Sequence, residues 1–145
     1  VYARENVGGL NVHDIECTLH EVAVYVRPNT SDGMSTISNC TCRLCSDDDI
    51  YFNNEFEGTP TGIESLNISN VSIFGNADDA PIELYGIDGN TILNLNNAVC
   101  EHSPYPIYFY GFGEANVLNC RTENSYEPNY CGDIDDLSIE NCIFS

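Results

Sequence analysis

An eight-residue pattern occurs six times in this 145-residue chain and limits the folds that it can adopt. Its order is apolar, any, apolar, any, Asn, apolar, any, apolar; residues 66–73, for example, read Leu-Asn-Ile-Ser-Asn-Val-Ser-Ile. The fifth positions are 25, 31, 27, 22 and 22 residues apart: Asp14, Asn39, Asn70, Asn97, Asn119 and Asn141. A recurrence of this length is typical of a solenoid, in which each copy supplies one coil of a stack.

The pattern predicts a strand that bends at its fifth residue. Leu66 and Ile68 alternate with period two and face one side, whereas Val71 and Ile73 alternate with the opposite parity. Both pairs reach one core only if the strand bends at Asn70, and Asn tolerates the left-handed backbone that such a bend needs. We expect an inward-facing ladder in which the fifth side chains hydrogen-bond from coil to coil. The one aspartate departs from this scheme, because an ionised carboxylate accepts hydrogen bonds but does not donate them.

A second strand follows each bend at a nearly constant distance. Triplets whose outer residues are apolar begin 10, 11, 12 and 10 residues after the fifth position, at residues 24–26, 50–52, 82–84 and 107–109. Their outer residues are expected to point inward and the middle residue outward. Loops rich in Gly, Pro, Asn and Asp separate the triplets from the next copy of the pattern. No stretch shows helical periodicity, so the sequence predicts an all-β chain.

Together these features resemble the right-handed parallel β-helix of the pectin-lyase-like superfamily. The resemblance covers residues 7–145 and implies a single domain, residues 1–145, of about six coils. Right-handed winding follows from the general preference of parallel crossovers. An antiparallel β-sandwich of short strands is the alternative, although it would not explain six aligned fifth positions. Neither end carries an amphipathic cap, so we expect either a segment of a longer protein or copies that stack end to end.

The charge balance restricts the partners of the chain. It has 23 acidic and 4 basic residues, no lysine, and a formal charge of −19. Such a chain is not expected to bind nucleic acid or an anionic membrane surface, and no apolar run is long enough to span a bilayer. Eight cysteines and two accessible glycosylation sequons, at Asn29 and Asn67, favour an extracellular or cell-surface location.

Six of the cysteines fall at inward positions of the pattern. Equivalent residues of neighbouring coils lie about 5 Å apart, within the range that a disulfide spans. Cys17 with Cys42 and Cys120 with Cys142 are therefore candidate bridges between coils. A reduced stack of interior thiols is the alternative, because a bridge across a flat parallel ladder is strained.

Polygalacturonases share the β-helix fold, and part of their motif pattern has a counterpart here. Residues 29–33, Asn-Thr-Ser-Asp-Gly, resemble the first element with one residue inserted, and residues 45–50 resemble the second. The later Gly-His-Gly and Arg-x-Lys elements are missing, and the chain has no lysine. The resemblance leaves Asp32, Asp47 and Asp48 as the candidate catalytic carboxylates, and a role in turns is the simpler interpretation.

Two acidic loops are candidate calcium sites. Carboxylate oxygens are the ligands that calcium prefers, and bound calcium would relieve part of the charge repulsion. The residues concerned are Asp47 and Asp49 in one loop and Asp133, Asp135 and Asp136 in the other. Neither loop has a known calcium-loop spacing, so solvation of the surface is the alternative.

The outward residues of the triplets form a partly aromatic stripe. Tyr25, Tyr51 and Tyr108 are its tyrosines, and Glu83 occupies the remaining position. Stacked exposed tyrosines could contact sugar rings or another protein, although tyrosine is also a good strand former on a half-covered sheet.

The sequence thus favours a non-catalytic, structural or adhesive extracellular β-helix without a required cofactor. A polysaccharide-active enzyme and a glycan-binding module are the alternatives, and the expected partners are further copies of the chain or a polysaccharide.

Overall fold

The computed structural model describes residues 1–4, 10–27, 33–56, 59–60, 63–75, 80–86, 89–104 and 107–145, and these residues form strands and loops without a helix. Two parallel sheets make up most of the fold, and a short antiparallel pair, β6 (Glu55–Phe56) and β7 (Thr59–Pro60), lies outside them. Sheet A contains β1 (Tyr2–Arg4), β3 (Val24–Arg27), β5 (Ile50–Asn53), β9 (Ile82–Tyr85), β11 (Tyr108–Tyr110) and β14 (Tyr130–Gly132). Sheet B contains β2 (Asn11–Thr18), β4 (Met34–Arg43), β8 (Ser65–Phe74), β10 (Ile92–Glu101), β12 (Glu114–Leu118) with β13 (Arg121–Glu123), and β15 (Asp136–Glu140) with β16 (Ile143–Phe144).

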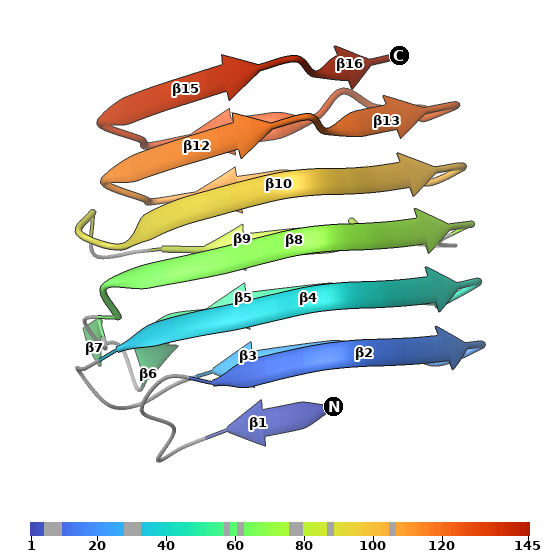
Figure 1. The fold of residues 1–145 in the computed structure, drawn as a ribbon, viewed down its shortest axis with the longest axis horizontal. Coiled ribbons are helices and arrows are strands. Elements are labelled where there is room, and N and C mark those ends of the chain that lie inside the picture. Colours follow the sequence, from blue (N-terminus) through green and yellow to red (C-terminus); the bar gives the residue numbers. More distant parts are fainter. Residues whose placement is uncertain are drawn as a thin grey trace.

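The chain winds as a right-handed parallel β-solenoid. In Figure 1 the sheet B strands run from left to right in front, the sheet A strands return behind them, and the stack rises from the N-terminus to the C-terminus. The prediction of a parallel β-helix is confirmed, and the antiparallel sandwich is excluded because every pairing within the two sheets is parallel. The described strands complete about five turns, because the sixth copy of the pattern forms only the sheet B half of a turn.

The core lies between the two sheets and consists of the apolar positions of the pattern. Leu66, Ile68, Val71 and Ile73 are each at most 1% exposed, although they lie on both sides of the bend. Residues at equivalent positions stack in register, as Leu66 does with Leu93. The bend therefore keeps both halves of each sheet B strand against one core, as the change of parity predicts.

The first corner of each coil lies at the fifth residue of the pattern. All six of these residues have left-handed backbones, with φ between 54° and 56°: Asp14, Asn39, Asn70, Asn97, Asn119 and Asn141. The expected conformation is confirmed, but the expected inward direction is wrong because all six are exposed. Two consecutive outward residues, such as Ser69 and Asn70, stand at each bend, and this pair produces the change of parity.

A second left-handed corner follows five residues after the first and was not predicted. Its residues are of mixed types, with φ of 59°, 55°, 74°, 57° and 56°: Leu19, Leu44, Gly75, His102 and Asn124. At this corner the amide of Leu19 donates to the carbonyl of Arg43 on the next coil (3.0 Å), and that of Leu44 donates to Phe74 (2.9 Å). Backbone bonding between coils thus continues around the corner.

The last sheet B rung exposes side chains that are buried in the preceding coils. Leu137 and Ile139 are 40% and 46% exposed, whereas Leu93 and Leu95 at the same pattern positions are fully buried. Among the described residues, none belongs to a helix long and apolar enough to cross a membrane.

Candidate functional site

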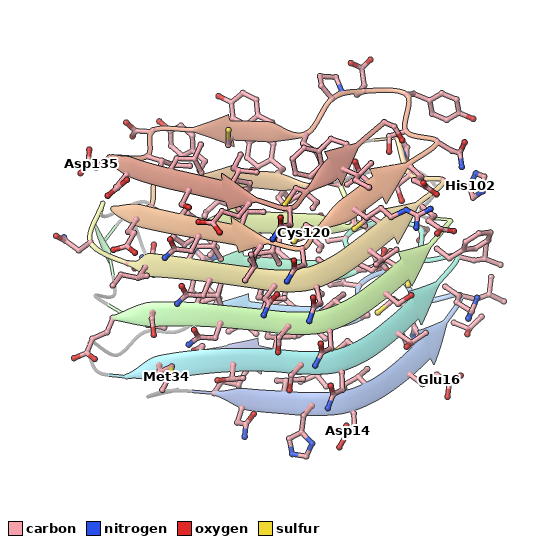
Figure 2. The ribbon with its side chains drawn as sticks, turned by 45° about the horizontal axis from the view of Figure 1, so that its top comes forward. Asp14, Glu16, Met34, His102, Cys120 and Asp135 are labelled. Carbon is pink, nitrogen blue, oxygen red and sulfur yellow. The ribbon has the colours of Figure 1, made fainter. Side chains whose placement is uncertain are left out.

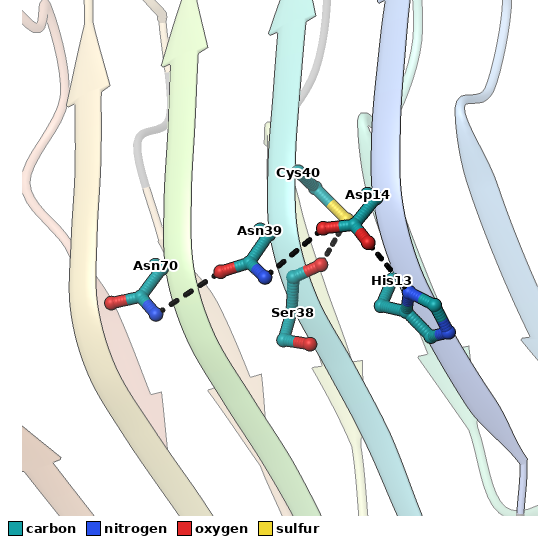
Figure 3. Close-up of polar contacts among 6 residues, drawn as sticks. All are labelled: His13, Asp14, Ser38, Asn39, Cys40 and Asn70. Carbon is teal, nitrogen blue, oxygen red and sulfur yellow. Dashed lines mark hydrogen bonds and ion pairs between the residues drawn. The ribbon is translucent and has the colours of Figure 1, made fainter.

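The fifth-position side chains form a hydrogen-bonded ladder on the outside of the first corner. Asn39 Nδ2 donates to Asp14 Oδ1 at 3.1 Å, and Asn70 Nδ2 donates to Asn39 Oδ1 at 3.2 Å (Figure 3). On the next coil, Asn97 Nδ2 donates to Asn70 Oδ1 at 3.1 Å. Each rung therefore donates to the rung before it. Asp14 only accepts, which suits its place on the first rung.

Asp14 has a second partner in its neighbour along the strand. His13 Nδ1 lies 2.9 Å from Asp14 Oδ2, and the pair is exposed on β2 (Figures 2 and 3). The hydrogen bond with His13, followed by the one from Asn39, holds the pKa of Asp14 below its ordinary value. Both partners favour the ionised carboxylate.

The ladder changes partner near its C-terminal end. Asn119 Nδ2 donates to Asn96 Oδ1 at 3.4 Å, and Asn96 is the residue before the expected partner, Asn97. Asn141 has the same left-handed backbone and exposed position as the other members.

A second row of amides lies on the outer face of sheet B. Asn94 Nδ2 donates to Asn67 Oδ1 at 2.9 Å, and Asn116 Nδ2 donates to Asn94 Oδ1 at 3.1 Å. The three residues occupy one register position on β8, β10 and β12. The predicted glycosylation acceptor Asn67 thus has its oxygen bonded to Asn94 and its nitrogen 3.4 Å from Ser65 Oγ. The other predicted acceptor, Asn29, lies outside the described residues.

The outer face of sheet A carries a continuous stack of five tyrosines. Tyr25 and Tyr51 stack with ring centroids 5.0 Å apart and planes 10° apart, and Tyr108 and Tyr130 stack at 4.7 Å and 12°. Tyr85 bridges the two pairs, with its ring 6.1 Å from that of Tyr51 and 5.5 Å from that of Tyr108. The predicted stripe of Tyr25, Tyr51 and Tyr108 is therefore present; Tyr25 and Tyr51 stack face to face, whereas the ring plane of Tyr85 is tilted by 53° from that of Tyr51 and by 49° from that of Tyr108.

Two members of this stack were missed by sequence reasoning. Glu83 holds the stripe's register position on β9, and Tyr85, two residues later, fills the gap with its ring while its hydroxyl donates to Glu83 Oε1. Burial, followed by this hydrogen bond, raises the pKa of Tyr85. Tyr130 lies in register with Tyr108. Its distance of 22 residues from Tyr108, equal to the last two spacings of the pattern, could have indicated it.

Two of the three candidate catalytic aspartates, Asp47 and Asp48, lie between β4 and β5. Of these two, Asp48 is buried, with 6% of its surface exposed. Asp47 is partly exposed, and its backbone amide donates to the carbonyl of Glu21 at 3.2 Å. Asp32 lies outside the described residues. Asp47 and Asp48 therefore do not both present an exposed carboxylate, as an acid–base pair for glycoside cleavage would require.

The two candidate calcium loops are far apart in the fold. Asp47 and Asp49 precede β5, whereas Asp133 and Asp135 are exposed in the turn before β15 and Asp136 is exposed as its first residue. Figure 2 labels Asp135. Within the described ranges no group of three or more His, Cys, Asp or Glu has an arrangement that could hold a metal ion. The negative charge of Asp133, followed by a hydrogen bond to the same residue, raises the pKa of Tyr110.

All eight cysteines are free thiols in this structure. Cys17 and Cys42 are register partners on β2 and β4, as predicted, and Cys17 Sγ lies 4.0 Å from Cys45 Sγ. At the other predicted pair, the Cys120 amide donates to Cys142 Sγ at 3.3 Å. Burial raises the pKa values of Cys40, Cys42, Cys45, Cys100 and Cys120.

Comparisons of the chain with protein-family models, with curated proteins and with solved structures found no match.

Proposed function

We propose that this chain is a non-catalytic, structural element of an extracellular surface: a stiff β-solenoid that serves as a spacer or adhesive stalk. The observation that carries the proposal is that outward side chains of both sheets contact the equivalent side chains of neighbouring coils. The tyrosine stack on sheet A and the two amide rows on sheet B all make contacts from rung to rung, along the axis of the solenoid.

Side-chain ladders of this kind support stiffness. Each rung contacts only its neighbours in a solenoid, so the cohesion of the stack is a sum of interfaces between adjacent rungs. Offset aromatic pairs contribute roughly 0.5–1.5 kcal/mol beyond the area that they bury, and side-chain ladders add hydrogen bonds between strands.

The geometry gives less support to the two alternatives, a glycan-binding module and a polysaccharide-active enzyme. A glycan-binding face would present ring faces to the sugar, whereas Tyr25 and Tyr51, and likewise Tyr108 and Tyr130, turn their ring faces toward each other. An enzyme that uses the candidate aspartates would need them accessible; Asp47 is partly exposed, but Asp48 is buried. Membership of the pectin-lyase-like superfamily is part of the proposal and rests on the parallel winding and the asparagine corner.

The test compares stability and binding in the double variant Tyr51→Ala/Tyr108→Ala. Loss of two half-buried rings and their stacking is expected to lower the free energy of unfolding by about 3 kcal/mol. Urea unfolding measures this, and Tyr126→Ala is the matched control because Tyr126 is 87% exposed and outside the stack.

The same proteins are then applied to a panel of acidic and neutral polysaccharides. We expect neither binding nor release of reducing ends or unsaturated products from any of them. Binding by the wild type that disappears in the folded double variant would contradict the structural proposal and establish the glycan-binding module. Turnover by the wild type would establish the enzyme.

A further inference from the structure

Three cysteine side chains meet where the first two sheet B strands end. Cys17 belongs to β2, Cys42 is its register partner on β4, and Cys45 follows β4 immediately after the left-handed corner at Leu44. Cys17 Sγ lies 4.0 Å from Cys45 Sγ. A shift of about 2 Å would bring two sulfurs at that distance to the length of a disulfide bond.

The three thiols differ in access to solvent. Cys42 and Cys45 are fully buried, whereas Cys17 is half-buried. Cys17 also lines a pocket of about 230 Å³ at the N-terminal end of the solenoid, together with Val1, Glu16 and His20. A small reagent therefore reaches Cys17 first.

We propose that Cys17 and Cys45 are a reversible disulfide site that is oxidised by a small-molecule disulfide entering at Cys17. The Cys17 thiolate attacks one sulfur of the reagent, forms a mixed disulfide and releases one thiol. Cys45 then attacks Cys17 Sγ, and the second half of the reagent leaves as a thiol. Two cysteine thiols and one disulfide thus give one protein disulfide and two small thiols, which carry away both protons.

The geometry favours Cys45 over the register partner Cys42. Cys17 and Cys42 extend side by side from paired parallel strands, where bridge dihedrals are strained. Cys45 lies in the segment beyond the corner and approaches Cys17 from another part of the chain.

The surroundings of Cys45 also set the order of the two steps. Burial, followed by a hydrogen bond with Asp49, raises the pKa of the Cys45 thiol. A higher pKa means a smaller thiolate fraction, which disfavours Cys45 as the thiol that attacks the reagent first.

The arginines of the chain allow a direct test. Trypsin cleaves after Arg4, Arg43 and Arg121 but not after Arg27, which precedes Pro28. A bridge from Cys17 to Cys45 joins fragment 5–43 to fragment 44–121, whereas a bridge from Cys17 to Cys42 stays within fragment 5–43. The full chain is treated with oxidised glutathione, its remaining thiols are alkylated, and the unreduced digest is examined by mass spectrometry.

We expect the joined fragments in the wild type and in Cys42→Ser, and their loss in Cys45→Ser and in Cys17→Ser. Fragmentation of the joined peptides identifies the two sulfurs in the wild type, so the result stands even if a variant folds poorly. A bridge confined to fragment 5–43, a junction that persists in Cys45→Ser, or an unmodified Cys17 would each overturn the proposal.

A second measurement follows the effect on the fold. Closing the loop between the two residues should raise the Tm of the wild type by several degrees, and dithiothreitol should reverse the shift. The Tm of Cys17→Ser should not respond to the oxidant. An unchanged wild-type Tm after complete formation of the bridge would show that it does not stabilise the first two coils, against the proposal.

Discussion

A single carboxylate sets the orientation of the amide ladder. Asp14 can only accept, so Asn39 must turn its nitrogen toward Asp14 and its oxygen toward Asn70. Asn70 must then donate to Asn39, and the same constraint passes to Asn97. One acidic residue on the first rung thus removes the ambiguity that each amide would otherwise have.

This carboxylate should also make stability depend on pH. Its pKa is lower in the folded chain than the ordinary value of 3.8. The stabilisation is therefore fully present above that value and is lost as the pH falls through the lower folded pKa. We expect Asp14→Asn to lose less unfolding free energy than the wild type between about pH 6 and about pH 3.

Urea unfolding at the two pH values gives this comparison. Asp135→Asn removes an exposed aspartate outside the ladder and serves as the control for net charge. If the free energy of unfolding fell by the same amount in the wild type and in Asp14→Asn, the Asp14 carboxylate would make no special contribution to the pH dependence of stability.

At the scale of the elements, the two corners of each coil meet the same backbone requirement with different residues. The first corner uses Asn or Asp throughout, whereas the second includes leucine at two of its five positions, Leu19 and Leu44. A left-handed residue with a branched side chain costs about 1–2 kcal/mol. The second corner is therefore less well adapted to its conformation than the first.

Introducing a glycine at this second corner should raise the free energy of unfolding, and replacing a glycine there should lower it. Leu19 is 75% exposed, so Leu19→Gly relieves strain with little loss of packing and should stabilise the chain by about 1 kcal/mol. Gly75→Ala should destabilise it by about 1–2 kcal/mol, because φ is +74° and the added Cβ would lie 2.9 Å from Leu44 Cδ2. Thermal unfolding of the two variants measures both effects, and the same sign in both would contradict this account of the corner.

The elements also show how far the sequence could predict the structure. Alternation on both sides of Asn70 was sufficient to predict extended chain on each side of a bend, which the structure joins into the single strand β8. The residue type Asn indicated the left-handed backbone of that bend. The outward direction of the ladder was mispredicted because the bend carries two outward residues in succession. The second corner could not be predicted because its residues share no residue type. The place of Tyr85 in the stack could not be predicted because Tyr85 lies two residues after Glu83, which holds the register position of the other tyrosines.

At the scale of the whole molecule, the charge of −19 opposes close contact between copies. The ladder adds a specific obstacle to the predicted end-to-end association. If the first rung of one copy followed the last rung of another in continuous register, Asp14 would have to donate to Asn141, which an ionised carboxylate cannot do.

Asp14→Asn should therefore increase end-to-end association at neutral pH. Analytical ultracentrifugation at high salt, which screens the general repulsion, compares the variant with the wild type and with Asp135→Asn. The same proportion of monomers and larger assemblies in all three proteins would show that the ladder does not control contact between copies.

The donor-to-acceptor order of the asparagines also has a practical consequence for engineering. A repeat that supplies a new amide can be appended beyond Asn141, where it would find an oxygen to bond. Inserting a repeat ahead of Asp14 requires substituting that aspartate first. Without such a substitution, the solenoid can be lengthened only at its C-terminal end.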